Sequence, residues 1–309
     1  MSTASRVPET HQLQGNDALH TLRTTGWRNL AKDSLARFAA ADGFSHARAV
    51  AFQLTLTALP GLISLVAMTT LLDNRPLRRV LEETLLSLAP GPASRILTTA
   101  FHQGTGAGGG SETSAFLVGL GITIVSGTMA MGLLERGANR IYGVQTDRDS
   151  FRKYLKAFFL ACSAGVLTFL GFLLLTMGST IGNAGRLVGG WSAEFFNTWS
   201  FVRWPAGLLT VVIAFSFLFK TAPRRRQPPV SWLSLGSGLA VGLWSAFTLL
   251  LVLYLRYSLE FGDTYGPLAG IIGILLWAYL SSLALFLGLA FTAQLEGVRA
   301  GVPTPVEAR

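Results

Sequence analysis

The sequence is poor in charged residues and in cysteine. Only 13% of its 309 residues are Asp, Glu, Lys or Arg, against about 25% in soluble globular proteins. Half of the residues are hydrophobic and the mean hydropathy is +0.46. This composition excludes disordered, fibrous and ordinary soluble proteins. The single cysteine, Cys162, excludes an intramolecular disulfide, and we expect it to be a small buried hydrophobic residue.

Histidine is also scarce, and its placement argues against an enzyme. The four histidines are His11, His20, His46 and His102, and the last is separated from the others by an apolar stretch. No zinc-type His/Cys spacing, no phosphate-binding Gly-Lys-Ser/Thr loop and no nucleophile motif accompanies them. The sequence therefore predicts no catalytic residues, no metal site and no cofactor.

Long uncharged stretches, in contrast, are abundant. Six of them are long enough, or nearly so, to cross about 30 Å of hydrocarbon as a helix. They cover residues 49–72, 115–134, 157–177, 204–219, 230–255 and 267–295. Residues 1–48 are polar and show no cleavable signal peptide, so the first stretch is expected to be a retained anchor. The fold class predicted is an all-α, polytopic membrane protein with six transmembrane helices.

The distribution of positive charge orients these spans. Of the 25 Lys and Arg residues, 18 fall in the N-terminal tail, the second and fourth connections and the C-terminal tail. The positive-inside rule then places both termini in the cytoplasm. Because the basic residues flank apolar stretches, the net charge of +9 indicates lipid contacts, and nucleic acid is not an expected partner.

Three regions follow from this topology. Residues 1–48 form a cytoplasmic tail, 49–296 the transmembrane domain and 297–309 a short cytoplasmic tail. Residues 17–40 carry Leu19, Leu22, Leu30, Leu35 and Phe38 among charges, which predicts an amphipathic helix on the inner membrane face.

The outer side carries two features. The external loop, residues 73–113, is expected to hold two short helices followed by a glycine-rich linker over 104–110. Between the third and fourth spans, Trp191, Phe195, Phe196 and Trp199 suit an interfacial helix or a cap over a cavity.

Polar side chains in the first span form a candidate substrate path. Gln53, Thr57, Pro60 and Ser64 are spaced by three or four residues and share one helix face, where Pro60 introduces a kink. This face could line a substrate cavity, or it could bond to neighbouring helices. In the fifth span, Gly238-x-x-x-Gly242 is interpreted as a helix-packing motif.

A second polar cluster lies between the fifth and sixth spans. Its members are Tyr254, Arg256, Tyr257, Glu260, Asp263 and Tyr265. They are typical of an aromatic belt with a local Arg256–Glu260 ion pair. The alternative is a gate or headgroup-binding rim at the outer leaflet.

Four segments resemble the YihY/BrkB family of bacterial inner-membrane proteins: residues 49–65, 138–144, 265–288 and 294–296. The family-motif positions within them are Asn139, Tyr142, Gly143, Gly266, Gly288 and Glu296. The resemblance implies six spans, cytoplasmic termini, a multi-pass location in the inner membrane, and a virulence-factor-like link to serum resistance. Ala290 and Thr292 stand where family members carry an acidic residue and often an asparagine. The family has also been labelled ribonuclease-like, but this sequence lacks the His/Asp cluster such an enzyme needs.

Two hypotheses of function follow. The first is a transporter, exporter or facilitator of a hydrophobic or amphiphilic solute, with membrane lipids as partners. The second is a non-transporting scaffold or envelope-assembly factor that binds envelope proteins. A polar cavity at Gln53 and Thr57 would favour the first, and a solidly packed bundle there the second.

Overall fold

The computed structural model describes residues 3–10, 13–71, 111–187, 192–257 and 268–306. These residues form the helices α1 (Gly15–Thr25), α2 (Trp27–Ala40), α3 (Gly43–Leu71), α6 (Ser111–Ile141), α7 (Ser150–Leu187), α8 (Ala193–Thr221), α9 (Val230–Tyr257) and α11 (Ala269–Arg299). Within these ranges the extended pairing is a single antiparallel bridge between Ala4 and Val306. The all-α prediction is confirmed for the described chain.

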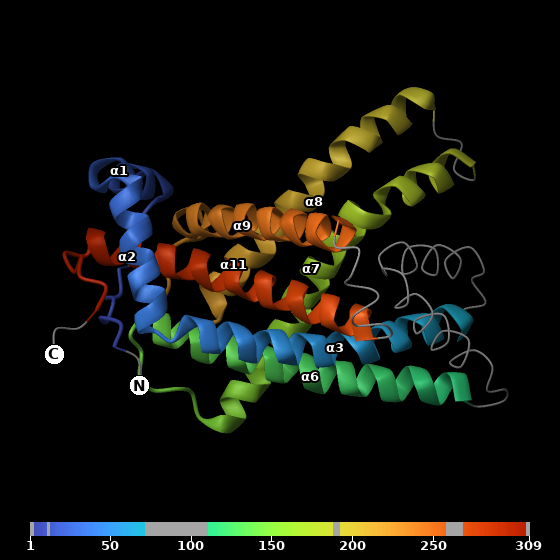
Figure 1. Cartoon of the computed structure of the whole chain (residues 1–309), viewed down its shortest axis with the longest axis horizontal. Coiled ribbons are helices and arrows are strands. Elements are labelled where there is room, and N and C mark those ends of the chain that lie inside the picture. The colour runs from blue at the N-terminus through green and yellow to red at the C-terminus, as the bar shows by residue number, and fades with distance from the viewer. Residues whose placement is uncertain (1–2, 11–12, 72–110, 188–191, 258–267, 307–309) are drawn as a thin grey trace.

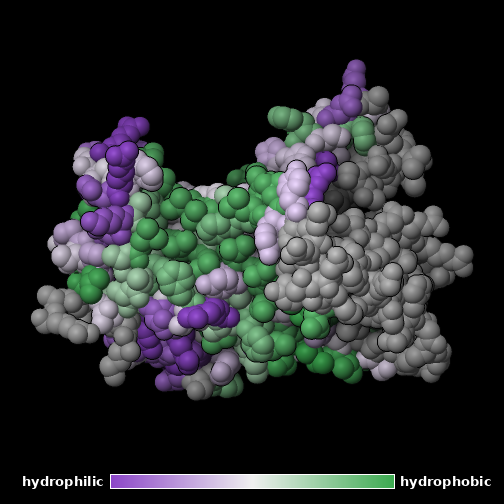
Figure 2. All heavy atoms as spheres, in the orientation of Figure 1, coloured by the Kyte–Doolittle hydropathy of each residue, from purple (hydrophilic) through white to green (hydrophobic). Residues whose placement is uncertain are grey.

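Four of the helices are long and apolar enough to cross a membrane: Phe116–Ile141, Glu194–Thr221, Val230–Tyr257 and Gly270–Arg299. They cover most or all of four predicted stretches, 115–134, 204–219, 230–255 and 267–295. α7 contains the stretch 157–177, and α3 covers residues 49–71 of the first stretch. Large apolar side chains such as Val125, Phe201 and Leu249 are exposed on these helices. Figure 2 shows hydrophobic residues across the middle of the molecule and hydrophilic ones toward its ends, near α1 and near the start of α8. An exposed apolar surface of this extent is typical of lipid contact.

The long helices form a layered bundle (Figure 1). α3 packs along α6, and α11 lies between α3 and α9. α7 and α8 pack on each other and leave the bundle at an angle, while α1 and α2 lie at the end that holds both termini. This end brings together segments far apart in the sequence.

The amphipathic segment differs from the single helix predicted over residues 17–40. Gly26 adopts a left-handed φ of +82°, which a glycine allows at little cost, and divides the segment into α1 and α2. Leu30 and Phe38 are buried in the protein core, whereas Leu19 and Leu35 are exposed. The apolar face of α2 therefore packs on protein, against α11 among others.

The close approach of helices also differs from the prediction. A Cβ on Gly238 or Gly242 would meet nothing within 4 Å, so this pair makes no interhelical contact within the described chain. The tight crossing of α9 and α11 uses Gly236 and Gly288 instead. A Cβ on Gly288 would lie 2.7 Å from the Gly236 carbonyl oxygen, and one on Gly236 would fall on the Thr292 hydroxyl. The interpretation of Gly238 and Gly242 as the packing pair was therefore wrong, because the face of α9 that packs on α11 carries Gly236.

Two further predictions are corrected. Phe195, Phe196 and Trp199 belong to α8 itself, whose first turn is capped by the Ser192 hydroxyl accepting from the Phe195 amide at 3.2 Å. They are not a separate interfacial helix. Cys162 is exposed on α7 rather than buried. The loop helices expected over 74–103, the 104–110 linker and Trp191 lie outside the described residues.

Candidate functional site: two ion clusters at one end of the bundle

Four segments meet at the end of the bundle that holds the termini. The Ser5 amide donates to the Pro305 carbonyl oxygen at 3.1 Å, and the Val7 amide donates to that of Tyr142 at 3.2 Å. The Arg224 amide donates to Asn139 Oδ1 at 2.7 Å. The N-terminal segment, the α6–α7 connection, the α8–α9 connection and the C-terminal segment therefore lie together, and all four were predicted to share one side of the membrane.

The first ion cluster, here the Glu296 cluster, contains Arg37, Tyr142, Arg225, Gln294 and Glu296. Arg225 Nη2 lies 2.7 Å from Glu296 Oε1, and only 2% and 0% of these side chains are exposed. The Arg225 guanidinium also stacks on the Tyr142 ring, with its carbon 4.6 Å from the ring centroid. Charges this deeply buried persist only when they are paired.

Arg37 connects this cluster to the chain termini. Its guanidinium is fully buried and donates to Gln294 Oε1 at 2.8 Å, to the Ser5 carbonyl at 2.8 Å and to the Ile141 carbonyl at 3.2 Å. Burial lowers the pKa of Arg37 to about 10, so it stays charged at neutral pH. It therefore fastens α2 to α6, α11 and the N-terminal segment at once.

The Glu296 cluster is not fully satisfied. Arg225 Nε and Nη1 and Glu296 Oε2 are buried without a hydrogen-bond partner among the described residues. Each such group costs about 1–3 kcal/mol. Burial, followed by the nearby Glu296 carboxylate, raises the pKa of Tyr142, so its hydroxyl stays protonated. The cluster therefore keeps two unsatisfied donor groups of Arg225 and one unsatisfied acceptor of Glu296 buried.

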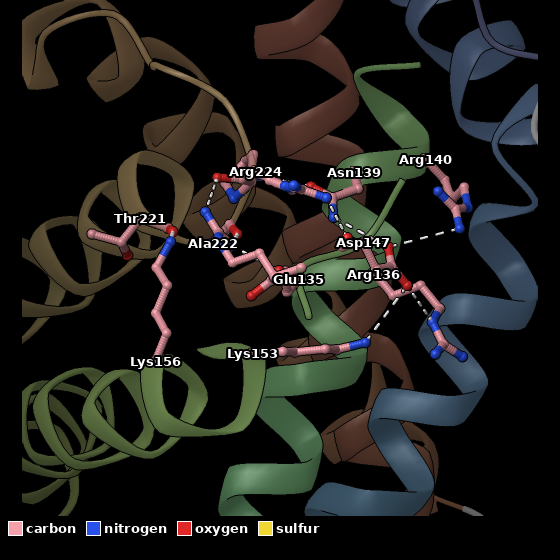
Figure 3. A network of polar contacts seen from close by, with 12 residues as sticks. Glu135, Arg136, Asn139, Arg140, Asp147, Lys153, Lys156, Thr221, Ala222 and Arg224 are labelled. Carbon is pink, nitrogen blue, oxygen red and sulfur yellow. Dashed lines mark hydrogen bonds and ion pairs between the residues drawn. The ribbon is translucent and has the colours of Figure 1, made fainter. Parts of the chain in front are cut away.

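The second cluster, here the Asp147 cluster, surrounds one carboxylate (Figure 3). Asp147 Oδ2 lies 3.1 Å from Arg136 Nε and 3.6 Å from Lys153 Nζ. Its Oδ1 lies 3.7 Å from Arg140 Nη2 and accepts from Asn139 Nδ2 at 3.3 Å. Three cations and one amide therefore converge on a single carboxylate.

Positive charge exceeds negative charge around Asp147. Burial raises the pKa of Asp147, but the Asn139 hydrogen bond and the nearby Lys153 and Arg136 outweigh it, and its pKa lies below the ordinary value. Arg148 pairs with Glu135 at 2.7 Å and also donates to two carbonyls of the α8–α9 connection. The interacting charged residues are Glu135, Arg136, Arg140, Asp147, Arg148, Lys153, Lys156 and Arg224. Six cations against two carboxylates leave a net charge of +4.

The predicted substrate-path residues lie on the α3 face that contacts α6. The Ser64 hydroxyl donates to the Phe116 carbonyl at 3.1 Å, and Thr57 donates to the Gln53 carbonyl at 2.8 Å. A Cβ on Gly119 of α6 would lie 3.0 Å from the Pro60 carbonyl oxygen. Gln53 Nε2 lies 3.8 Å from the sulfur of Met129, a partly exposed residue of α6. Ser64 and Pro60 are thus packed against α6, whereas Gln53 reaches its outer edge.

The predicted outer-rim residues are only partly described. Tyr254, Arg256 and Tyr257 are exposed at the end of α9. Glu260, Asp263 and Tyr265, together with the motif residue Gly266, lie outside the described residues.

The other family-motif positions gather at the two clusters. Asn139 belongs to the Asp147 cluster, and Tyr142 and Glu296 to the Glu296 cluster. Gly143 has a φ of +72°, and a Cβ there would lie 2.6 Å from Arg6 Cα, which explains the glycine. Gly288 lies at the α9–α11 crossing.

Ala290 and Thr292, the two departures from the family pattern, are both buried. Thr292 donates to the Gly288 carbonyl at 2.9 Å. In this chain both positions pack the bundle interior and carry no charge.

Sequence reasoning missed Arg37 and Asp147. Arg37 was counted among the charges of an interfacial helix, yet it lies seven residues after Leu30 and so shares the buried face of α2. This spacing from Leu30 could have predicted that Arg37 is buried. Asp147 lies in a short connection without helical periodicity, and its partners become neighbours only when α7 folds back on α6.

Comparisons with known proteins identify a family and two relatives of the chain. The model of the family described as "Virulence factor BrkB" matches residues 34–308. YfkH of Bacillus subtilis (strain 168), whose name describes it as ribonuclease-like, is 26% identical over 267 residues, covering 86% of this chain and 94% of YfkH. UPF0761 membrane protein IL2447 of Idiomarina loihiensis is 24% identical over 196 residues, covering 61% of this chain and 64% of that protein. No solved structure matches. With nearly nine-tenths of its length matched by the family model, the chain belongs to the BrkB virulence factor family of membrane proteins.

Proposed function

We propose that this protein facilitates the movement of an amphiphilic solute across the bacterial inner membrane. In this proposal α3, α6, α7, α8, α9 and α11 are six spans, and both termini with the two ion clusters face the cytoplasm. The four segments that the charge distribution predicts to be cytoplasmic gather at one end of the bundle, which supports this orientation.

One observation carries the proposal: polar and cationic groups border an exposed apolar face of α6. Val118, Ile122, Val125 and Met129 are exposed, and their spacing of four, three and four residues places them on one face. The same face ends at Arg136, seven residues after Met129, and Gln53 contacts Met129 from the side. We call these four apolar residues the α6 stripe.

A polar side chain beside lipid is costly, so its presence calls for a function. An amphiphile moving along the α6 stripe would keep its tail in lipid while Gln53 and Arg136 offer hydrogen bonds to its head. In a purely structural bundle Gln53 would contribute only the contact with the Met129 sulfur at 3.8 Å, and a thioether is a weak hydrogen-bond acceptor.

The test is lipid movement in proteoliposomes. Phosphatidylcholine vesicles with the full chain and a fluorescent phosphatidylglycerol are treated with a membrane-impermeant quencher, and quenching of the inner-leaflet fraction is followed. We expect protein-dependent movement, slowed about ten-fold by Gln53→Leu through the loss of one hydrogen bond to a charged group.

The control variant is Thr55→Val, in the same helix as Gln53. Thr55 and Thr57 both bond back to the helix, to the carbonyls of Ala51 and Gln53, but Thr55 is buried and Thr57 adjoins α6. Thr55→Val should leave the rate unchanged. Equal quenching in empty vesicles and proteoliposomes would refute facilitated movement and leave the scaffold as the better hypothesis.

We also propose that the chain is not a ribonuclease, although YfkH is named ribonuclease-like. No group of three His, Cys, Asp or Glu side chains that could hold a metal ion occurs in the part of the chain that is described. The purified protein incubated with a labelled single-stranded RNA should leave it intact, and cleavage that a Glu296→Gln variant abolishes would overturn this.

A further inference from the structure

The Asp147 cluster has more positive charge than its carboxylates neutralise, and part of it is open to the surroundings. Arg136 uses only its Nε on Asp147, and its side chain is 49% exposed. Lys153, by contrast, is 8% exposed and reaches Asp147 from the buried side, across Gly132. A net charge of +4 at a membrane end attracts anions from the adjoining surface.

The geometry around Asp147 is that of an anion site whose anion is part of the chain. Arg136, Arg140, Lys153 and the Asn139 amide place four donor groups 3.1–3.7 Å from its two carboxylate oxygens. Arginine and lysine donors converging in this way bind phosphate oxygens as readily as carboxylate oxygens. In Figure 3, Arg136 and Lys153 point to Asp147 from opposite helices, α6 and α7.

Apolar groups adjoin the site on the side that faces away from the bundle. The α6 stripe leads directly from Arg136. On α7, Tyr154 follows Lys153, is half-exposed and lies beside Gly132, one turn before Arg136. Leu155 and Phe159 are exposed on the same helix. A ligand bound at the cluster would therefore have its charged head among cations and its tail against apolar side chains.

We propose that the Asp147 cluster binds the phosphate of an amphiphile, and that the Asp147 carboxylate fills the site until the phosphate displaces it. This inference rests on the proposed function for the amphiphilic nature of the ligand, and it adds the chemistry of the head group and the residues that bind it.

The experiment measures lipid retention on the full chain by native mass spectrometry in a neutral detergent. The probes are phosphatidylglycerol, phosphatidylcholine and inorganic phosphate. Arg136→Gln should weaken phosphatidylglycerol retention about five-fold, which equals the roughly 1 kcal/mol of one cation near an anionic surface. Asp147→Asn should strengthen it by a similar factor, because it removes the competing carboxylate.

Asp17→Asn is the matched control. Asp17 pairs with Arg299 at 3.2 Å at the same end of the bundle, so this variant makes the same change in charge away from the cluster. Retention on Asp17→Asn should equal that of the wild type. If Asp147 only supported the fold, Asp147→Asn would lower retention instead of raising it. Because that variant could also fold poorly, the Arg136→Gln result is an independent arm at a half-exposed position.

Three results would overturn the proposal: equal effects of Asp147→Asn and Asp17→Asn, unchanged retention on Arg136→Gln, or equal retention of phosphatidylglycerol and phosphatidylcholine. Displacement of phosphatidylglycerol by millimolar inorganic phosphate alone would assign the site to soluble phosphate rather than to a lipid. The quenching experiment separates the two proposals. If phosphatidylglycerol retention changes as expected in the Arg136→Gln and Asp147→Asn variants but no lipid moves in the vesicles, the site is supported and transport is refuted. If lipid moves but retention does not change in this way, transport is supported and the site is refuted.

Discussion

The two ion clusters lie at the same end of the bundle and use arginine in opposite ways. In the Glu296 cluster, Arg37 and Arg225 are sealed and directed at backbone carbonyls, a glutamine and one carboxylate. In the Asp147 cluster, Arg136 is half-exposed and shares its carboxylate with two other cations. The first arrangement fixes the chain segments, and the second leaves positive charge available to a ligand.

This difference follows from what surrounds each cluster. The N-terminal segment crosses the Glu296 cluster, where Thr10 donates to Glu296 and the Pro8 carbonyl accepts from Arg225. No described segment covers Arg136 in the same way. Burial therefore makes one cluster sensitive to the loss of a single partner, while exposure makes the other sensitive to its net charge.

The largest expected effect comes from breaking the sealed pair. Arg225→Met leaves the Glu296 carboxylate buried and unpaired, which should lower the free energy of unfolding by about 3–5 kcal/mol. Because two apolar side chains of similar volume can replace a buried pair at little cost, the double variant Arg225→Met/Glu296→Met should recover most of that loss. Reversible denaturation in mixed micelles measures both.

The control for this prediction is the exposed pair Arg299–Asp17, whose side chains are 42% and 33% exposed. Arg299→Met should change the free energy of unfolding by less than about 1 kcal/mol. Losses of similar size at Arg225 and Arg299 would contradict the contrast between a sealed and an exposed cluster.

A smaller effect is expected at the α9–α11 crossing, which holds Glu296 opposite the α8–α9 connection. Gly236→Ala places a Cβ on the Thr292 hydroxyl and 2.9 Å from the Gly288 carbonyl oxygen. Overpacking of this kind should cost about 1–3 kcal/mol. The matched variant Gly238→Ala, two residues away in open space, should leave the thermal midpoint in detergent unchanged or slightly raised.

Adding Thr292→Ala to Gly236→Ala should restore part of the stability by removing the hydroxyl. If Gly238→Ala were as harmful as Gly236→Ala, the assignment of the helix crossing would be wrong.

The sequence predicted the helical class and the apolar stretches because lipid contact imposes a strong, local rule on composition. It also indicated the family positions Asn139, Tyr142 and Glu296, which the structure brings to the clusters. It missed the crossing at Gly236, since every glycine in an apolar helix looks equally suited to packing. Only the direction of each helix face decides between Gly236 and Gly238.

The partners of Asp147 were unpredictable for a related reason. Arg136 and Lys153 are 17 residues apart on two helices, and nothing local fixes how these helices face each other. The break at Gly26 was similarly hidden, because a single glycine inside an amphipathic pattern is compatible with a continuous helix and with two.

The smallest expected effect is the response of the Asp147 cluster to acid. The folded-state pKa of Asp147 lies below its unfolded value of about 3.9, so the unfolded chain binds the proton first as the pH falls. Its contribution to stability is therefore complete above about pH 5 and is lost as the pH falls below about 4.

Other carboxylates titrate in the same range, so the informative quantity is the difference in thermal midpoint between the wild type and Asp147→Asn. Thermal midpoints in detergent at pH 7, 5 and 3.5 should show a gap between the two proteins that is constant from pH 7 to 5 and narrows at 3.5. A gap that closes between pH 7 and 5 would mean that the three cations do not hold this carboxylate ionised. The net charge of the cluster would then have to be counted with Asp147 neutral.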